Sequence, residues 1–433
     1  EIYMGDWSSD VCSSDLRWNA GSLRSLDRNG TRSETFVLRS DGITIERRVS
    51  RRDGSVHTTT FRLPKPLRLK QPSQSRLSAL ADRIFLQMKR RPAVKRNGHT
   101  IRVVDLFSGC GAMSFGAAEA CRALGYRMKS ALAVDLNETA LVAYKANFPS
   151  ATTDSRNISE LLDGRLGSPK SRGERALARK LGKVDLLLGG PPCQGHSDLN
   201  NHTRRTDPKN ALYDRMARFA EVIQPRHIVI ENVSAVLHDK GRVVERTKRH
   251  LEKLKYHVEH MVVDAAVFGT PQNRRRHILV ASLARKPNLA AVVELYGIDS
   301  PRTAGWAISD LRGLRSEAPI DRPSAATAAA QRRIDYLFEK GCYNLPNSER
   351  PRCHREKKDH TYKSVYGRMH WGKPAQTVTS GFTCMGQGRF VHPRERRTIT
   401  PHEAARLQFI PDFFSFGPIW RSEERRVGKE CRS

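Results

Sequence analysis

A cysteine follows two consecutive prolines at the end of an apolar run, in the stretch LLLGGPPCQG that contains Cys193. The apolar run predicts a buried strand, and the ligand crevice of a doubly wound sheet lies beyond the carboxyl ends of its strands. Proline fixes φ and cannot continue a helix, so Pro191 and Pro192 hold the thiol in one place. Most buried cysteines are inert small hydrophobic residues. The restrained position favours a nucleophile instead.

Two further segments carry polar groups that could serve such a nucleophile. The stretch IVIENV ends an apolar strand in Glu231. Its carboxylate is either hydrogen-bonded at the strand end, or has a raised pKa and donates a proton. The stretch FGTPQNRRRHI carries Arg274 and Arg276, and the alternation of a strand puts both side chains on one face. They are either surface charges or, if they face the crevice, groups that bind anions and hold a carboxylate.

A glycine-rich turn, DLFSGCGAMSFG, joins a predicted strand to a predicted helix over residues 105–116. Its glycines allow a tight turn and let a ligand approach the helix N-terminus. Gly116 comes too late for the dinucleotide fingerprint GxGxxG. Asp135, which ends the next predicted strand, is placed to accept both hydroxyls of a ribose. These features indicate a nucleoside ligand without a pyrophosphate, such as S-adenosylmethionine; the alternative is a plain strand–helix turn.

The elements that must position these residues follow from the apolar pattern. From about residue 101 to residue 282, short apolar runs alternate with turns and helical patterns: IRVVDLF, SALAVDL, KVDLLLGG, HIVIENV and RHILVAS. This alternation predicts an α/β fold with a doubly wound parallel sheet and helices on both faces. Residues 282–366 are irregular, with one helical patch near 324–340. Upstream, residues 35–63 predict a β meander, and the spacing over 76–90 predicts an amphipathic helix that serves as core or docking surface.

The composition narrows the class of partner. The chain has 433 residues and a net charge of +31, which favours a polyanion such as nucleic acid over a soluble protein with a merely basic surface. No apolar run approaches the ~20 residues of a membrane span, and the acidic, polar start does not resemble a signal peptide. The cysteines form no CxxC pair and no secreted framework, so we expect a reducing cytoplasm.

Both ends differ in composition from everything between them. Residues 1–16 and 421–433 resemble translations of the synthetic adapters that are ligated to DNA for sequencing, and we exclude both from fold reasoning.

Taken together, the motifs resemble those of the DNA (cytosine-5) methyltransferase family. The resemblance covers roughly residues 101–281 and 367–416, through the ordered elements DLFSGCG, AVDLN, GGPPCQG, DPKNALY, ENV, PQNRRRHI and RTITPHEAARLQFIPDFF. It implies a Rossmann-like S-adenosylmethionine-dependent domain with a smaller, irregular target-recognition domain. The implied division is an adapter-like segment (1–16), a basic N-terminal extension (17–95), the catalytic domain (96–281), the target-recognition region (282–366), a return segment (367–420) and a second adapter-like segment (421–433).

The resemblance also implies roles for individual residues. Cys193 would attack carbon 6 of a cytosine flipped out of the duplex, and Glu231 would bond to ring N3 and the exocyclic amine. Arg274 and Arg276 would position the base and support the anionic cysteine. The loop 195–210, with Arg204, Arg205 and Lys209, would close over the DNA. The implied cofactor residues are Phe107, Gly109, Cys110, Ala112, Asp135, Leu136, Asn157, Ile158, Pro192 and Leu212.

Three features depart from the family pattern. Asn157 stands where the family has an aspartate, although its amide oxygen can still accept from adenine, and His196 stands where phenylalanine is common. The family's closing Gly-Asn-Ala-Val segment is not found, so we expect a gene cut at a sequencing boundary and weakened cofactor binding.

The partners expected from the resemblance are double-stranded DNA and a cognate restriction endonuclease, for a monomer in the bacterial cytoplasm. An RNA cytosine-5 methyltransferase of the same fold and a weakly active DNA-binding relative are the alternatives. A Rossmann oxidoreductase is disfavoured by the late Gly116. Zinc at Cys342, Cys353 and His354 is disfavoured because no CxxC pair is present.

Overall fold

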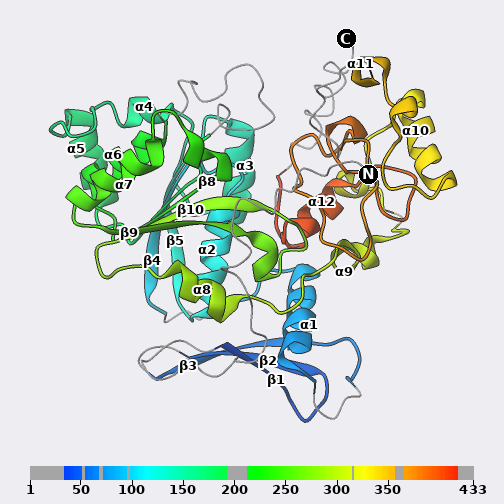
Figure 1. Ribbon diagram of the computed structural model, residues 1–433. Helices are drawn as coiled ribbons and strands as arrows, with labels where there is room; N and C mark the ends of the chain where they lie inside the picture. The colour runs from blue at the N-terminus through cyan, green and yellow to red at the C-terminus, as the bar shows by residue number, and fades with distance from the viewer. Residues whose placement is uncertain are drawn as a thin grey trace.

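The computed structural model describes residues 34–50, 54–67, 72–94, 98–192, 212–314, 316–355 and 365–417. Cys193, the 195–210 loop and both adapter-like segments lie outside the described residues. Figure 1 shows three parts, which we name the sheet lobe (98–297), the second lobe (304–407) and the N-terminal unit (34–94).

The sheet lobe is built on seven strands in the order β6-β5-β4-β7-β8-β10-β9. Strands β4 to β8 pair in parallel, whereas β10 runs antiparallel to both β8 and β9. The bounds are β4 (Thr100–Leu106), β5 (Arg127–Val134), β6 (Thr153–Asp154), β7 (Leu186–Gly189), β8 (His227–Val233), β9 (His257–Asp264) and β10 (Arg275–Ser282). The doubly wound α/β prediction is confirmed, but the parallel direction expected for RHILVAS is wrong.

The reversal of β10 has a simple cause in chain length. Only residues 265–274, including the short helix η3 (Ala265–Phe268), connect β9 to β10. A parallel crossover needs a dozen or more residues, so this connection returns the chain antiparallel. The sequence pattern also failed to predict β9, because His257, Glu259 and His260 interrupt its apolar run.

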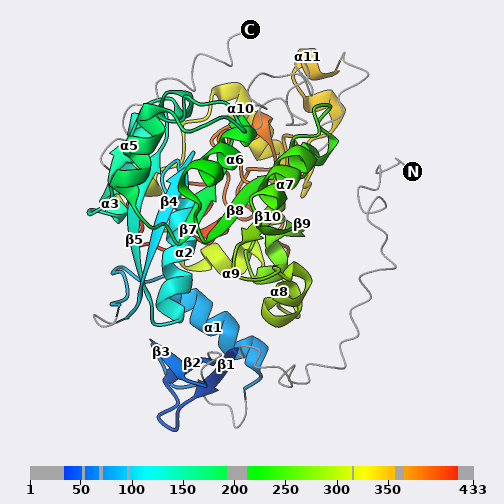
Figure 2. The same cartoon turned by 90° about the vertical axis from the view of Figure 1, so that its left-hand side faces the viewer.

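Helices cover both faces of the sheet, as Figures 1 and 2 show. One face packs with α5, α6 and α7 through Leu187, Phe219 and Leu251, and the other with α2 and α3 through Ala133, Phe115 and Tyr144. Full burial of one such large side chain is worth about 1.5–3 kcal/mol. The bounds are α2 (Ala112–Ala123), α3 (Glu138–Asn147), α4 (Ile158–Leu161), α5 (Arg172–Leu181), α6 (Leu212–Ile223), η2 (Ser234–His238), α7 (Val243–Lys253) and α8 (Leu289–Tyr296).

In the second lobe, the described residues form short helices and isolated bridges rather than strands. Two small cores hold it together, one around Ile308 and Phe390, the other around Leu337 and Val391. Both combine residues from 304–345 with residues from 365–407. The helices are α9 (Ala304–Ile308), η4 (Ser309–Leu311), η5 (Pro319–Asp321), α10 (Ala328–Glu339), η6 (Asn347–Glu349), α11 (Arg352–Arg355), η7 (Met385–Gln387) and α12 (Pro401–Leu407). The helix expected near 324–340 is α10.

The N-terminal unit has the predicted meander and helix. Its strands β1 (Glu34–Leu38), β2 (Thr44–Ser50) and β3 (Val56–Arg62) form an antiparallel sheet in that order, followed by α1 (Gln74–Leu86). Ser73 caps α1 by accepting from the backbone N–H of Arg76.

The apolar stripe of α1 forms core, as the spacing indicated. Leu77, Ala81 and Phe85 are buried against the meander, and the ring of Phe85 lies 6.4 Å from that of Phe115 on α2. Arg83 Nη2 donates to Ser309 Oγ at 2.6 Å. The unit is therefore fixed to both lobes.

None of the described helices combines the length and the apolar character that crossing a membrane requires.

Candidate active site

Two adjacent strands bring three of the expected residues together. Glu231 lies on β8, Arg276 lies on β10, which pairs with β8, and Arg274 directly precedes β10. Arg276 Nε is 2.7 Å from Glu231 Oε1. Burial lowers the pKa of Arg274 to about 10, an effect that the charge of Arg276 increases and the charge of Glu231 opposes. The three charged groups therefore form one electrostatic cluster.

The backbone just before Cys193 is fixed to the same strand. Asn232 is buried, and its Nδ2 donates to the carbonyl oxygen of Pro191 at 3.3 Å. A Cβ atom on Gly190 would lie 3.4 Å from Glu231 Oε2, so this backbone passes directly beside the carboxylate. Cys193 itself lies outside the described residues, but the chain that leads to it is held next to Glu231.

The glycine-rich turn adopts left-handed backbone conformations at three positions. φ is 59° at Phe107, 52° at Gly109 and 92° at Gly111, which precedes α2. A Cβ atom on Gly111 would lie 2.7 Å from a ring carbon of Tyr144, so glycine is required there for space as well as for conformation. A non-glycine residue such as Phe107 at positive φ is strained, and such strain clusters at functional sites.

Asp135 fixes the far side of this turn. Its Oδ2 accepts from the Gly109 N–H at 2.8 Å, and its Oδ1 accepts from the Asn137 N–H at 2.9 Å. A carboxylate has about four acceptor sites, so both oxygens can still accept from ribose hydroxyls.

Asp105 is a buried acid beneath the same turn that the sequence motifs did not single out. Its Oδ2 accepts from Ser114 Oγ at 2.7 Å, whereas its Oδ1 has no hydrogen-bond partner among the described residues. Burial raises the pKa of Asp105 to about 7. An unsatisfied buried acceptor costs about 1–3 kcal/mol, which a bound donor would recover.

The ten expected cofactor residues all lie at the carboxyl ends of four neighbouring strands. Phe107, Gly109, Cys110 and Ala112 follow β4; Asp135 and Leu136 follow β5; Asn157 and Ile158 follow β6; Pro192 and Leu212 flank the segment after β7.

The exposed fraction of the side chain differs among the ten expected cofactor residues, and this fraction decides which of them a ligand can contact. Leu136 is 67% exposed, which leaves an apolar surface beside Asp135. The Asn157 side chain caps α4 by accepting from the Ser159 N–H at 2.9 Å. Ile158 is 4% exposed within the sheet core, so a ligand could meet its backbone more readily than its side chain. A cavity of about 530 Å³ between β5 and α5 is lined by none of the ten residues.

Two buried residues next to the cluster were not predicted from the sequence. Tyr213 comes one residue after Leu212 in DPKNALY, and its hydroxyl has no hydrogen-bond partner among the described residues. Burial raises the pKa of Tyr213, and the negative charge of Glu231 raises it further. Gln272, in PQNRRRHI, donates to the Leu407 carbonyl at 3.2 Å and accepts from the Val378 N–H at 2.8 Å. It joins the start of β10 to the second lobe. Both residues lie inside the motifs DPKNALY and PQNRRRHI, so these motifs are the sequence signal that could have identified them.

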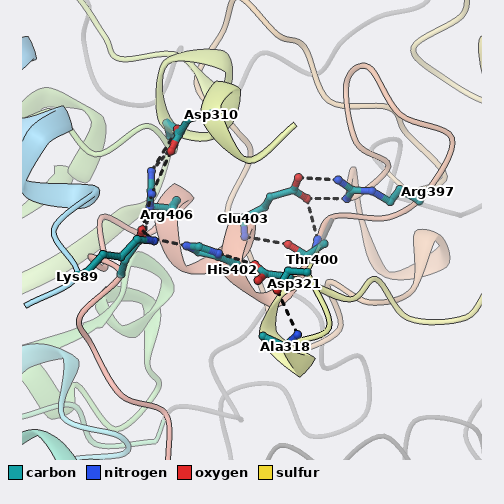
Figure 3. Close-up of polar contacts among 12 residues, drawn as sticks. Lys89, Asp310, Ala318, Asp321, Arg397, Thr400, His402, Glu403 and Arg406 are labelled. Carbon is teal, nitrogen blue, oxygen red and sulfur yellow. Dashed lines mark hydrogen bonds and ion pairs between the residues drawn. The ribbon is translucent and has the colours of Figure 1, made fainter. Parts of the chain in front are cut away.

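A polar network around α12 determines how the second lobe is assembled (Figure 3). Thr400 and Glu403 form a capping box, and Arg397 binds Glu403 through two contacts of 2.7 Å. His402 lies between Asp321 at 2.7 Å and Asp412 at 2.8 Å. These contacts connect η5, α12 and the segment that packs on α1.

No group of three or more histidine, cysteine, aspartate or glutamate side chains within the described ranges is arranged to hold a metal ion. Cys342 donates to the carbonyl oxygen of Lys340 at 3.6 Å, and His354 Nδ1 lies 2.9 Å from the Tyr366 hydroxyl.

The chain is similar to known proteins of one family. A profile of the C-5 cytosine-specific DNA methylase family matches residues 101–429. The chain is 45% identical to the Type II methyltransferase M1.BsuMI of Bacillus subtilis (strain 168), over 91% of each chain. It is 30% identical to the Type II methylase M.HgiDII of Herpetosiphon aurantiacus, over 76% of this chain and 89% of the relative. The crystal structure of S. pombe Dnmt2 methyltransferase shares the fold, with a TM-score of 0.51 and 17% identity over 76% of this chain and 93% of that one.

The mainly parallel sheet has a Rossmann-like fold, and the family profile shows that the chain is a methyltransferase. More specifically, the chain belongs to the C-5 cytosine-specific DNA methylase family. It is therefore an enzyme, a DNA (cytosine-5-)-methyltransferase.

Proposed function

We propose that this chain transfers a methyl group from S-adenosylmethionine to carbon 5 of a flipped-out cytosine in duplex DNA, as the methyltransferase of a type II restriction-modification system. The observation that carries the proposal is the cluster of Glu231, Arg274 and Arg276 beside the tethered backbone that leads to Cys193. The similarity to two type II methyltransferases supports the restriction-modification role.

The residues at the carboxyl edge of the sheet fit S-adenosylmethionine. Asp135 would hold the ribose hydroxyls, the exposed Leu136 would lie against the adenine ring, and the side-chain oxygen of Asn157 would accept from its amine. The unpartnered Oδ1 of Asp105 is a further acceptor below the turn. When bound, this group supplies an electrophilic methyl on a sulfonium.

The first chemical step belongs to Cys193. Its thiolate forms a bond to carbon 6 of the cytosine, and the electron pair of the 5,6 double bond shifts toward carbon 5 and ring N3. Positive charge nearby stabilises a thiolate, and Arg274 and Arg276 supply that charge. The hydrogen bond from Asn232 to Pro191 restrains the backbone that leads to the thiol, so less entropy is lost when the thiol takes up the geometry of attack.

Glu231 neutralises the negative charge that would develop on the cytosine ring. Its carboxyl group donates a proton to N3 while its other oxygen accepts from the exocyclic amine, so the adduct forms without a full negative charge. Arg276, 2.7 Å away, orients this carboxyl group. After methyl transfer, a solvent water takes the carbon-5 proton, which restores the 5,6 double bond and expels the Cys193 thiolate, and the N3 proton returns to Glu231.

We further propose that the protein acts as a monomer in a bacterial cytoplasm, associated with the nucleoid, and that a cognate endonuclease exists.

The test is bisulfite sequencing of DNA from cells that express the chain, paired with the same assay on their RNA. Protected cytosines within one recurrent DNA sequence are expected. Protection confined to RNA would favour the RNA methyltransferase alternative, and protection in neither would contradict the proposal.

A further inference from the structure

The N-terminal sheet packs one face on α1, and its other face carries exposed side chains. Because side chains alternate along each strand, Phe36, Ile45 and Phe61 share the inner face, where they are buried with Phe85. The outer face presents the exposed side chains of Thr35, Arg48, Val56, Thr58, Thr60 and Arg62. It is a regular, polar and basic surface.

Two arginines are held in place on this outer face by one carboxylate. Glu46 is only 5% exposed, because the guanidinium groups of Arg39 and Arg48 cover it. Arg48 donates to Glu46 Oε2 at 2.9 and 2.6 Å, and Arg39 donates to Oε1. The two arginine side chains nevertheless remain 55% and 46% exposed. They are ordered before any partner arrives.

The charge and chemistry of the face select the class of partner. Residues 34–94 contain 14 lysines and arginines against five aspartates and glutamates. Protein interfaces favour aromatic residues, methionine and arginine at their centre, and of these the described residues of this outer face include only arginine. Threonine and arginine together match phosphate oxygens and base edges.

The dimensions of the sheet also fit duplex DNA. Neighbouring strands lie about 4.8 Å apart, so two adjacent strands of this sheet form a narrow ribbon. The major groove of B-DNA is about 12 Å wide and admits a two-stranded β-ribbon. We propose that the outer face of β1–β3 is a second DNA-binding surface, which contacts duplex DNA outside the site that holds the target cytosine.

The place of the sheet in the molecule supports a separate contact. Figures 1 and 2 both show it as a layer below the two lobes. The ion pair of Arg302 with Asp82 and the bond of Arg83 with Ser309 fix α1 to the second lobe. The family profile begins at residue 101, so this unit lies outside the matched region.

The test compares two double variants with equal reduction of charge. R48Q/R62Q removes two arginines from the outer face, whereas R172Q/R179Q removes two exposed arginines from α5. The probe is a random-sequence duplex of about 40 bp, and the slope of log Kd against log salt falls by about 0.9 for each phosphate that the protein no longer neutralises. We expect a decrease of up to about 2 and a roughly tenfold weaker Kd at about 0.15 M salt for R48Q/R62Q. The α5 variant is expected to match the parent chain.

Hydrogen exchange on the parent chain provides the second measurement, with protection of β2 and β3 amides by the duplex as the expected result. Equal salt slopes for the two variants, at equal thermal stability, would overturn the proposal. So would unchanged exchange of the β2 and β3 amides in the presence of the duplex. Because neither readout involves methylation, failure of the proposed function leaves this test intact.

Discussion

At the residue scale, the proposed chemistry depends on proton donation from Glu231 to ring N3 of the cytosine. Arg276 Nε lies 2.7 Å from Glu231 Oε1, so this arginine holds the carboxyl group in one orientation.

Glu231→Gln should separate hydrogen bonding from proton donation. The amide keeps the shape and its bonds but has no acidic proton, so kcat is expected to fall by about 10²–10⁴. Affinity for duplex DNA should change far less. Single-turnover methylation and DNA titration measure the two effects, with the exposed Glu245→Gln on α7 as the control. Equal reductions in rate and affinity would indicate a structural role instead.

Cys193→Ser tests the nucleophile directly. A serine hydroxyl has a far higher pKa than a thiol, so methyl transfer should fall to background while DNA binding persists. The parent chain should form a covalent adduct on a duplex with 5-fluorocytosine, because fluorine replaces the proton that must leave carbon 5. Cys342→Ser should behave as the parent chain does. Adduct formation by Cys193→Ser at the parent's yield would exclude Cys193.

At the element scale, residues 190–192, which directly follow β7, are held by a contact with β8. Asn232→Ala removes the hydrogen bond to Pro191 and releases the backbone beside Glu231. Misplacement of a reacting group by about 1 Å can cost about 10² in rate, so we expect kcat to fall tenfold to a hundredfold with little change in KM. Asn288→Ala, which removes the cap of α8, is the matched control. A rate unchanged in Asn232→Ala would mean that the prolines alone position the thiol.

The network around α12 predicts a pH dependence of stability. Burial lowers the pKa of His402, but the bonds to Asp412 and Asp321 outweigh it, so the net shift is upward. The charged imidazolium therefore contributes stability fully below pH ~6.5 and loses it as pH rises through the higher folded pKa. The pKa of Asp412 is shifted down in spite of its burial, by bonds from His402, Arg406 and Lys89, so its contribution disappears only as pH falls below about 4.

His402→Gln should remove this dependence. The variant should be less stable by about 1.5–3 kcal/mol at pH ~6, because Asp321 no longer has a charged partner, and by less at pH ~9. Urea unfolding at both pH values measures the difference, with exposed His257→Gln as the control for histidines in general. A destabilisation that is the same at both pH values would show that His402 is neutral in the folded chain.

Sequence patterns predicted elements better than their directions. The apolar runs located β4, β5, β7, β8 and β10, but strand direction depends on connection length, and without β9 the short return to β10 could not be foreseen. The sequence identified Glu231, Arg274 and Arg276 because each lies in a motif of a few consecutive residues. Gln272 has partners more than 100 residues further along the chain, which only the fold brings close. The burial of Tyr213 and Asp105 likewise becomes visible only in the folded chain.

At the scale of the whole molecule, the predicted target-recognition region and the return segment share their cores. Ile308 and Leu337 come from the first, and Phe390 and Val391 come from the second. A buried mismatch of one large side chain costs about 2–5 kcal/mol. An exchange of residues 282–366 with a relative must therefore keep the buried positions of 304–345 to leave the lobe folded.

With those positions kept, the exchange should move the methylated sequence and preserve the chemistry. The proposed catalytic cluster of Glu231, Arg274 and Arg276 lies outside the exchanged segment. Gln272 and its partners Val378 and Leu407 also lie outside it. Base contacts determine sequence choice, at about 1–3 kcal/mol for each well-placed pair, so a new segment should replace one site by another. Bisulfite sequencing of a plasmid methylated by the hybrid reads the new site, and an exchange with the parent's own segment controls for the procedure. An active hybrid that still methylates the parent's site would place specificity elsewhere, with the N-terminal unit as the next segment to exchange.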